Sequence, residues 1–167
     1  MELTQQDIAD VKQLVNLESK INKISGEEVN LITDEIFQKQ PFFLTVLLGF
    51  RFDIELEEME EIIKIYLLIW EYFRTSKKVQ TIKVTQEHFE TTQAKFFSML
   101  QYIEGEPREV NKSRIYEADF NKLKSKVLFA VVLKRFTTSP ILEKMDGRNK
   151  GIILMGIKSF IVCFETV

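Results

Sequence analysis

The sequence predicts an all-α protein, a compact single-domain bundle of about six to eight helices over residues 1–167. Its centre is a nearly fully buried helix at residues 55–74. Two observations support this fold class. Helix breakers are scarce, because the 167 residues include only 6 Gly and 3 Pro, whereas average usage would give about 20. One long segment is apolar around nearly its whole circumference, which is typical of a helix that other helices cover on every side.

The central helix is predicted from the narrow polar stripe of the segment 55–74. Its polar residues Glu57, Glu60, Lys64 and Glu71 fall at helical spacing, on one side of a helix. The remaining circumference is apolar, and it carries Leu56, Met59, Ile62, Ile63, Ile65, Tyr66, Leu67, Leu68, Ile69, Trp70, Tyr72 and Phe73. Pro41 begins a shorter apolar helix that ends near Gly49. The two segments together predict a helical hairpin.

Two helices are expected before this hairpin. Thr4 is placed to cap a helix that ends near Lys23, and Ser25 with Glu28 forms a capping-box pattern that starts another, ending before Pro41. The first helix has a broad apolar face of Ile8, Val11, Leu14, Val15, Leu17, Ile21 and Ile24. In the second, we expect Val29, Ile32, Ile36 and Phe37 to point inward.

After the hairpin, residues 75–81 are polar and predict a connection. Residues 79–84 could be briefly extended, but an isolated strand there would have no strand to pair with. Thr85 caps the next helix, which has Phe89, Phe96, Phe97, Leu100 and Ile103 on one side. The segment 104–114 contains Gly105 and Pro107, and it is the most loop-like part of the chain.

The last third of the chain predicts three more helices. A stripe of Tyr116, Phe120, Leu123 and Val127 continues without a breaker into the apolar run 127–133. We expect that run to be the second buried element, packed on residues 62–73. Ser139 and Pro140 start a short helix. A turn at Asp146–Gly151 leads into a final helix with Ile153, Ile157, Phe160 and Phe164 at helical spacing.

The residues that carry chemistry form no recognisable catalytic, metal or nucleotide motif. His88 is the only histidine and Cys163 the only cysteine, and a zinc site needs more such ligands. No metal, cofactor or catalytic residue is therefore predicted. The basic, glycine-containing turn at Asp146–Gly151 could bind an anion at a helix N-terminus, but it lacks the spacing of a phosphate-binding loop.

Charge and composition narrow the classes of partner. Residues 1–75 carry a net charge of −8 and residues 76–167 a net charge of +6. This asymmetry favours attraction between the two halves, within one chain or across a homodimer, over binding to nucleic acid. The apolar run of the central helix is interrupted by Lys64 and Glu71, so no membrane span is predicted. The N-terminus lacks the pattern of a signal peptide, and a cytoplasmic location is expected.

The sequence therefore favours a non-catalytic helical protein that acts through protein–protein interaction or regulation, with itself or another protein as its partner. This interpretation depends on the large apolar circumference of the predicted helices together with the lack of a catalytic motif. One alternative is a helical domain that binds an apolar small molecule among its phenylalanines, in a cavity of a few hundred Å³. Another is a carboxylate-based enzyme in which Glu57, Glu60 or Glu71 meets an acidic residue from another helix.

Overall fold

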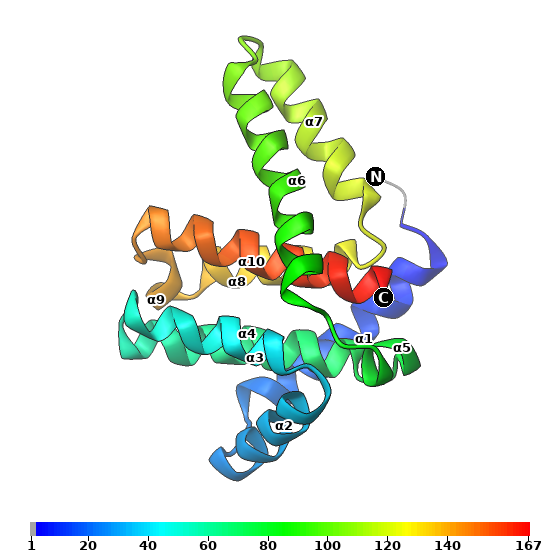
Figure 1. Ribbon diagram of the computed structural model, residues 1–167, viewed down its shortest axis with the longest axis vertical. Coiled ribbons are helices and arrows are strands. Elements are labelled where there is room, and N and C mark those ends of the chain that lie inside the picture. Colours follow the sequence, from blue (N-terminus) through cyan, green and yellow to red (C-terminus); the bar gives the residue numbers. More distant parts are fainter. Residues whose placement is uncertain (1–2) are drawn as a thin grey trace.

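The computed structural model describes residues 3–167, and their secondary structure is helical throughout (Figure 1). This confirms the predicted all-α fold class. The elements in order are α1 (Gln5–Asn22), α2 (Gly26–Lys39), α3 (Pro41–Gly49), the 3-10 helix η1 (Phe50–Phe52), α4 (Leu56–Phe73), α5 (Lys77–Thr81), α6 (Gln86–Gly105), α7 (Glu109–Lys122), α8 (Lys126–Thr138), α9 (Pro140–Glu143) and α10 (Gly147–Thr166).

Helix α4 occupies the centre, as predicted. From Ile65 to Glu71 every side chain is buried, and α4 contacts α1, α2, α3, α8, α9 and α10. Much of its core packing is aromatic. The ring of Phe43 in α3 stacks on Tyr66 at 4.5 Å, and it meets Phe160 of α10 edge-on at 4.8 Å. Such ring pairs stabilise a core beyond the area that they bury.

Helix α10, rather than α8, is the second strongly buried helix. Its predicted apolar positions Ile153, Ile157, Phe160 and Phe164 are all buried, and so are the small residues Gly156 and Ser159. In α8, by contrast, Leu128, Phe129 and Val132 are buried, but Ala130 and Leu133 are exposed. The prediction of an all-round buried segment at 127–133 is therefore wrong. An apolar run does not show whether neighbouring elements cover every side of it.

The expected apolar face of α1 is only half buried. Leu14 and Ile21 are buried, but Ile8 and Val15 are exposed, while the acidic Asp7 and Asp10 lie inside. Specific partners explain the inversion. Asp7 accepts bonds from the cap residue Thr4 and pairs with Lys126 of α8 at 3.2 Å, and Asp10 accepts a 3.0 Å bond from the Tyr72 hydroxyl. In α2, Phe37 is likewise exposed rather than inward.

Three connections also differ from the sequence prediction. The polar stretch after α4 contains the short helix α5. Helices α6 and α7 extend into the segment 104–114, so the expected loop shrinks to residues 106–108. The predicted continuous helix from 116 to 133 is broken at residues 123–125, where the Ser125 amide donates to the Glu165 carboxylate at 2.6 Å. These differences bring the described part of the chain to ten α-helices, against the six to eight expected.

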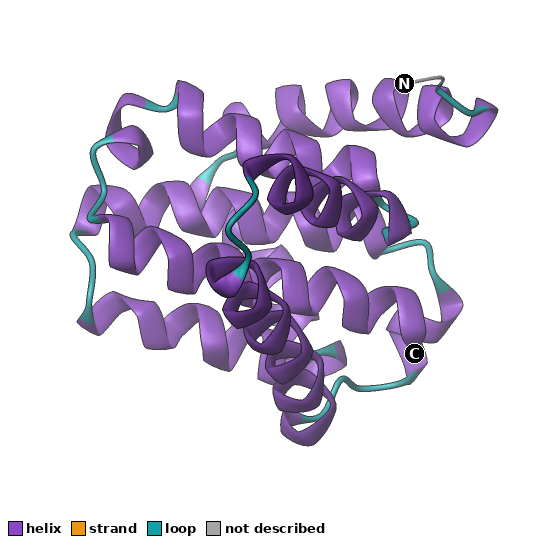
Figure 2. Cartoon of the chain, turned by 90° about the horizontal axis from the view of Figure 1, so that it is seen from above, coloured by secondary structure: helices purple, strands orange, loops and turns teal. Residues whose placement is uncertain are grey.

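The helices form a body from which a hairpin projects. Helices α3, α4, α8 and α10 run roughly side by side, and α6 crosses them steeply, with α7 returning beside it (Figure 1). The view from above shows the same hairpin in front of the body (Figure 2). Helix α6 packs along α10, whereas α7 contacts α8 and also reaches α10 through the ion pair of Asp119 with Lys158. Within residues 3–167, no helix has the length and apolar character needed to cross a lipid bilayer.

Candidate functional site

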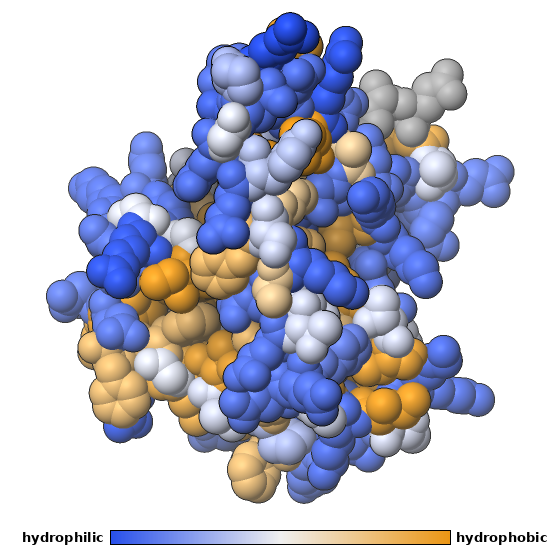
Figure 3. Space-filling model, turned by 45° about the horizontal axis from the view of Figure 1, so that its top comes forward, coloured by the Kyte–Doolittle hydropathy of each residue, from blue (hydrophilic) through white to orange (hydrophobic). Residues whose placement is uncertain are grey.

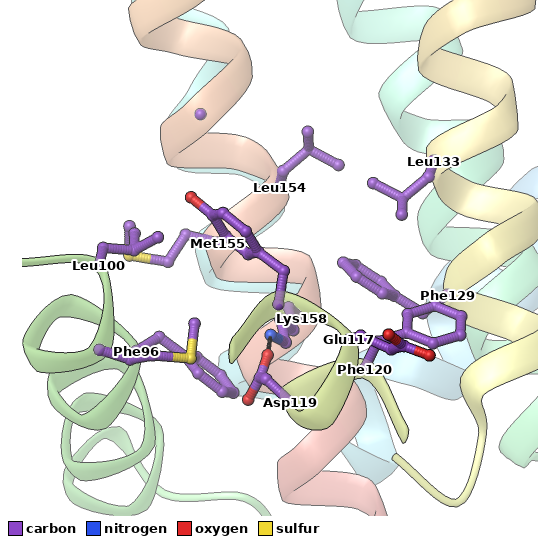
Figure 4. A pocket seen from close by; sticks show the side chains of 13 residues that line it. Phe96, Leu100, Glu117, Asp119, Phe120, Phe129, Leu133, Leu154, Met155 and Lys158 are labelled. Carbon is purple, nitrogen blue, oxygen red and sulfur yellow. Dashed lines mark hydrogen bonds and ion pairs between the residues drawn. The ribbon is translucent and has the colours of Figure 1, made fainter. Parts of the chain in front are cut away.

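A half-open apolar cavity of about 520 Å³ lies where the α6–α7 hairpin meets α8 and α10. We call it the hairpin pocket. Figure 4 shows side chains from all four helices pointing toward it. Its lining is mainly aromatic, aliphatic and thioether, and it consists of Phe96, Met99, Leu100, Tyr116, Glu117, Asp119, Phe120, Phe129, Leu133, Gly151, Leu154, Met155 and Lys158.

Helical periodicity places these side chains on facing surfaces. Phe96 and Leu100 lie one turn apart on α6, as do Leu154 and Lys158 on α10. Tyr116 and Phe120 repeat the spacing on α7. Helix α7 has no buried residue, because most of its side chains are polar and its aromatic Tyr116 and Phe120 face this pocket instead of a close-packed neighbour. Of the stripe predicted from the sequence, Tyr116 and Phe120 therefore line a cavity, whereas Leu123 is buried and Val127 belongs to α8.

One ion pair marks the polar side of the pocket. The Lys158 ammonium pairs with the Asp119 carboxylate, and both side chains are largely shielded, with 13% and 16% of their surface exposed. The same ammonium lies 4.4 Å from the centroid of the Phe96 ring and 5.8 Å from that of Phe129. Aromatic faces attract a cation. Lys158 is thus held between two rings and one carboxylate, at the edge of an otherwise apolar space.

The carboxylates considered for catalysis do not gather into one site. Glu57 and Glu60 are exposed near the start of α4. Glu71 is buried and binds two cations, Lys20 at 2.9 Å and Arg74 at 3.1 Å. Arg74 also binds Glu35 of α2 at 2.7 Å, so these acids are joined through basic groups. Glu71 is therefore buried rather than exposed on the polar stripe predicted for α4, and its ion pairs connect α4 with α1 and, through Arg74, with α2.

A metal-type cluster of three or more His, Cys, Asp and Glu side chains is not found within residues 3–167. His88 lies with its Nε2 3.2 Å from the Thr166 hydroxyl, and it lines a smaller cavity of about 260 Å³ next to the hairpin pocket. Cys163 is buried against Thr92, with 3.6 Å between sulfur and oxygen. Burial raises the pKa of the Cys163 thiol, which disfavours the reactive thiolate.

The turn at Asp146–Gly151 is already capped by its own carboxylate. Asp146 accepts bonds from the amides of Arg148 and Asn149, at 3.0 and 3.1 Å, and α10 begins at Gly147 rather than after the turn. These are amides that an external anion would need. The Asn149 side chain also donates to the backbone oxygen of Asp53 at 2.9 Å, tying the start of α10 to the start of α4.

A second apolar feature lies where α4 and α10 begin. We call it the end surface, and it comprises Leu48, Phe52, Leu56 and Ile152, which are 47%, 77%, 72% and 48% exposed. Figure 3 shows apolar side chains gathered at the lower left, on this side of the body. Acidic Asp53 and basic Arg148 line one cleft together with Ile152, and the Arg51 guanidinium lies 4.8 Å from the centroid of the Phe52 ring.

The sequence held partial signals for the hairpin pocket. The phenylalanine stripe of α6 and the stripe beginning at Tyr116 were both visible as helical spacing. The place where these stripes meet α10 could not be predicted, because Asp119 and Lys158 are 39 residues apart in the sequence. The break at residues 123–125 also changes the direction of the chain between α7 and α8. No family model matches the chain, and no curated protein or solved structure shows significant similarity to it.

Proposed function

We propose that this protein binds an apolar small molecule in the hairpin pocket. The observation that supports the proposal is the pocket itself, about 520 Å³ of mainly apolar lining with one polar pair. Small-molecule sites in proteins have volumes of about 300–1,000 Å³, apolar walls and a few polar groups that orient the ligand. The hairpin pocket has each of these properties, and four separate helices contribute to it.

The driving force would be removal of apolar surface from water. Each buried methylene contributes about 0.8 kcal/mol, so a ligand with eight to ten carbons gains roughly 6–8 kcal/mol. That gain corresponds to about micromolar affinity before the cost of immobilisation is subtracted, so the expected affinity is weaker than micromolar. The phenylalanine and methionine walls suit flexible or aromatic ligands alike, because thioether side chains adapt to irregular shapes. This proposal takes up the small-molecule alternative that the sequence left open.

The test uses a matched pair of leucine substitutions. Leu133 lines the pocket and is 37% exposed, and Leu48 lies outside it and is 47% exposed. A short carboxylate at position 133 would face the ligand inside the pocket without a partner. Titration with the fluorescent apolar probe N-phenyl-1-naphthylamine should give saturable binding to the native chain, weakened on the order of tenfold or more by Leu133→Asp.

The control Leu48→Asp should leave the affinity for the probe unchanged, because it adds the same charge and the same helix propensity cost on a different surface. Circular dichroism would establish that both variants remain helical. Absence of saturable binding to the native chain would overturn the proposal. Equal loss of affinity in both variants would place the bound probe outside the hairpin pocket.

A second candidate function is self-association through the end surface, in keeping with the interaction role that the sequence favours. Phe52 and Leu56 are the specific observation behind it, because each large apolar side chain is more than two thirds exposed. Charges of both signs, those of Asp53 and Arg148, line the cleft beside this surface. A two-fold axis through this surface would set the acidic start of α4 in one copy against the basic start of α10 in the other.

Sedimentation equilibrium measures this directly. A homodimer should form at micromolar concentration, and Phe52→Glu should shift the chain to monomer. The matched control is Phe97→Glu, which adds the same charge at a phenylalanine that is 51% exposed, but on α6 away from the end surface. A native chain that stays monomeric at about 100 μM would contradict self-association, since that concentration corresponds to a weak binding free energy.

A further inference from the structure

The polar groups of the hairpin pocket define which head group its ligand carries. Lys158 and Asp119 face each other there, and their charges cancel. Glu117 lies on the same lining and is exposed. Counted as formal charges, the pocket therefore carries about −1 at its rim and about zero inside.

The ion pair has bonding capacity to spare. An ammonium has three N–H donors, and a carboxylate can accept several bonds. Within residues 3–167, the Lys158 ammonium has one hydrogen-bonding partner, Asp119, and that bond uses only the Oδ2 atom of the carboxylate. Lys158 can still donate and Asp119 can still accept, side by side at the edge of an apolar space.

A charged ligand would be poorly matched to this pair. A carboxylate on the ligand would bind Lys158 but would sit beside Asp119 and Glu117, and like charges at close range in a shielded site repel strongly. An ammonium would compete with Lys158 for Asp119 and would bring two cations together. Either ion would also lose its hydration on entering the apolar cavity. A hydroxyl avoids all three costs, since it donates to Asp119 and accepts from Lys158.

We propose that the ligand of the hairpin pocket is an apolar alcohol of about ten carbons, whose hydroxyl bridges Lys158 and Asp119 while its hydrocarbon part packs against Phe96, Phe129 and Leu154. This inference rests on the proposed function and specifies its ligand class. It also gives α7 a role. Asp119 is the residue through which α7 meets both the ligand and α10.

The experiment compares three ligands of equal chain length on the unaltered protein at pH 7.5. These are 1-decanol, decanoate and decylammonium, each kept below its micelle or solubility limit and measured by displacement of N-phenyl-1-naphthylamine. Decanol should bind at least about tenfold more tightly than either ion, since an uncompensated charge in an apolar site is costly.

A double variant, Lys158→Met with Asp119→Leu, removes both charges together. Replacing a shielded ion pair by apolar groups of similar size usually preserves folding. In this variant decanol should still bind through its chain, but several-fold more weakly than in the native protein, because a buried hydroxyl without a partner is costly.

The outcomes separate the two proposals. Binding of decanoate or decylammonium as tight as that of decanol would overturn the alcohol inference and leave the apolar pocket standing. Undiminished decanol binding by the double variant would also overturn it. If neither the probe nor any of the three decyl compounds binds the native chain, the proposed function fails, and this inference fails with it.

Discussion

The centre of the body and the projecting hairpin both carry phenylalanines at helical spacing but pack them in opposite ways. Phe43 in α3 is fully buried among three other rings, whereas Phe97 in α6 is 51% exposed. Helix α4 has ten buried residues out of 18, and α7 has none. The difference shows that apolar residues at helical spacing stabilise the fold in one region and line a cavity in the other.

The largest expected effect compares these two phenylalanines. Phe43→Ala removes a ring that packs on Tyr66, Phe160 and Phe164, and it should lower the free energy of unfolding by about 3–5 kcal/mol. Phe97→Ala removes the same atoms from the hairpin surface and should cost less than about 1 kcal/mol. Urea denaturation followed by circular dichroism measures both. Similar losses for the two variants would break the distinction between centre and hairpin.

The next effect concerns the joint between the two regions. The side chain of Gln40 is buried at the end of α2, where its amide nitrogen donates to the carbonyls of Val79 and Ile82, at 2.7 Å each. Its oxygen accepts from the Val84 amide at 2.9 Å. Gln40→Ala leaves these backbone groups without their partner and should destabilise the chain by about 2–4 kcal/mol.

The matched control is Gln38→Ala, two residues earlier on the exposed side of α2. It should change stability by no more than about 0.5 kcal/mol, as surface substitutions usually do. The same urea titration applies. Equal behaviour of the two alanine variants would mean that the Gln40 bonds do not hold the segment that leads into α6.

A smaller effect is expected inside the centre itself. The Tyr66 hydroxyl is buried and has no hydrogen-bond partner within residues 3–167, and burial raises the pKa of Tyr66 because the phenolate would be unsolvated. Tyr66→Phe keeps the ring stacked on Phe43 and removes the unpaired group. Stability should stay constant or rise by up to about 1 kcal/mol. A loss of more than 1 kcal/mol would reveal a bond to this hydroxyl.

The smallest effect lies at the edge of the body, where α1 meets α8. Bonds from the Thr4 backbone and side chain, and then the ion pair with Lys126, hold the pKa of Asp7 below its usual value of 3.8. A carboxyl with a lowered folded-state pKa stabilises the fold above its unfolded-state pKa, and this stabilisation is lost as the pH falls through the folded-state value.

Asp7→Asn should therefore be less stable than the native chain near pH 7, and the gap should narrow below about pH 4. Thermal unfolding across pH 2.5–7 compares the two chains. Asp34→Asn, at an exposed acidic residue of α2, is the control. A gap between native chain and Asp7→Asn that stays constant down to pH 2.5 would contradict the role given to the Asp7 carboxylate.

The sequence predicted the elements whose causes are local. Thr4, Ser25, Thr85 and Ser139 cap helices as their positions indicate. The central helix was predicted at residues 55–74 and is observed as α4 (Leu56–Phe73), because its composition leaves only a narrow polar side for water. Helix caps and the helical spacing of apolar residues can be predicted from the sequence because each depends on residues within one or two turns of the same helix.

The features that escaped prediction depend on distant residues. Asp10 is buried because Tyr72 reaches it from α4, and the helix break near Ser125 is stabilised by Glu165 at the far end of the chain. Pro107 suggested a long loop, yet it lies in a connection of three residues between two helices. The hairpin pocket is the same kind of feature, since its lining comes from four helices whose packing no single segment encodes.

Binding within the hairpin pocket can be tested residue by residue, by recording methyl NMR spectra of leucine- and methionine-labelled protein during titration with 1-decanol. The account predicts that the methyl signals of the pocket residues Met99, Leu100, Leu133, Leu154 and Met155 shift and saturate together, while those of Leu67 and Leu68 in the closed centre of α4 stay in place. Unchanged pocket signals at saturating decanol, or shifts confined to other methyl groups, would contradict it.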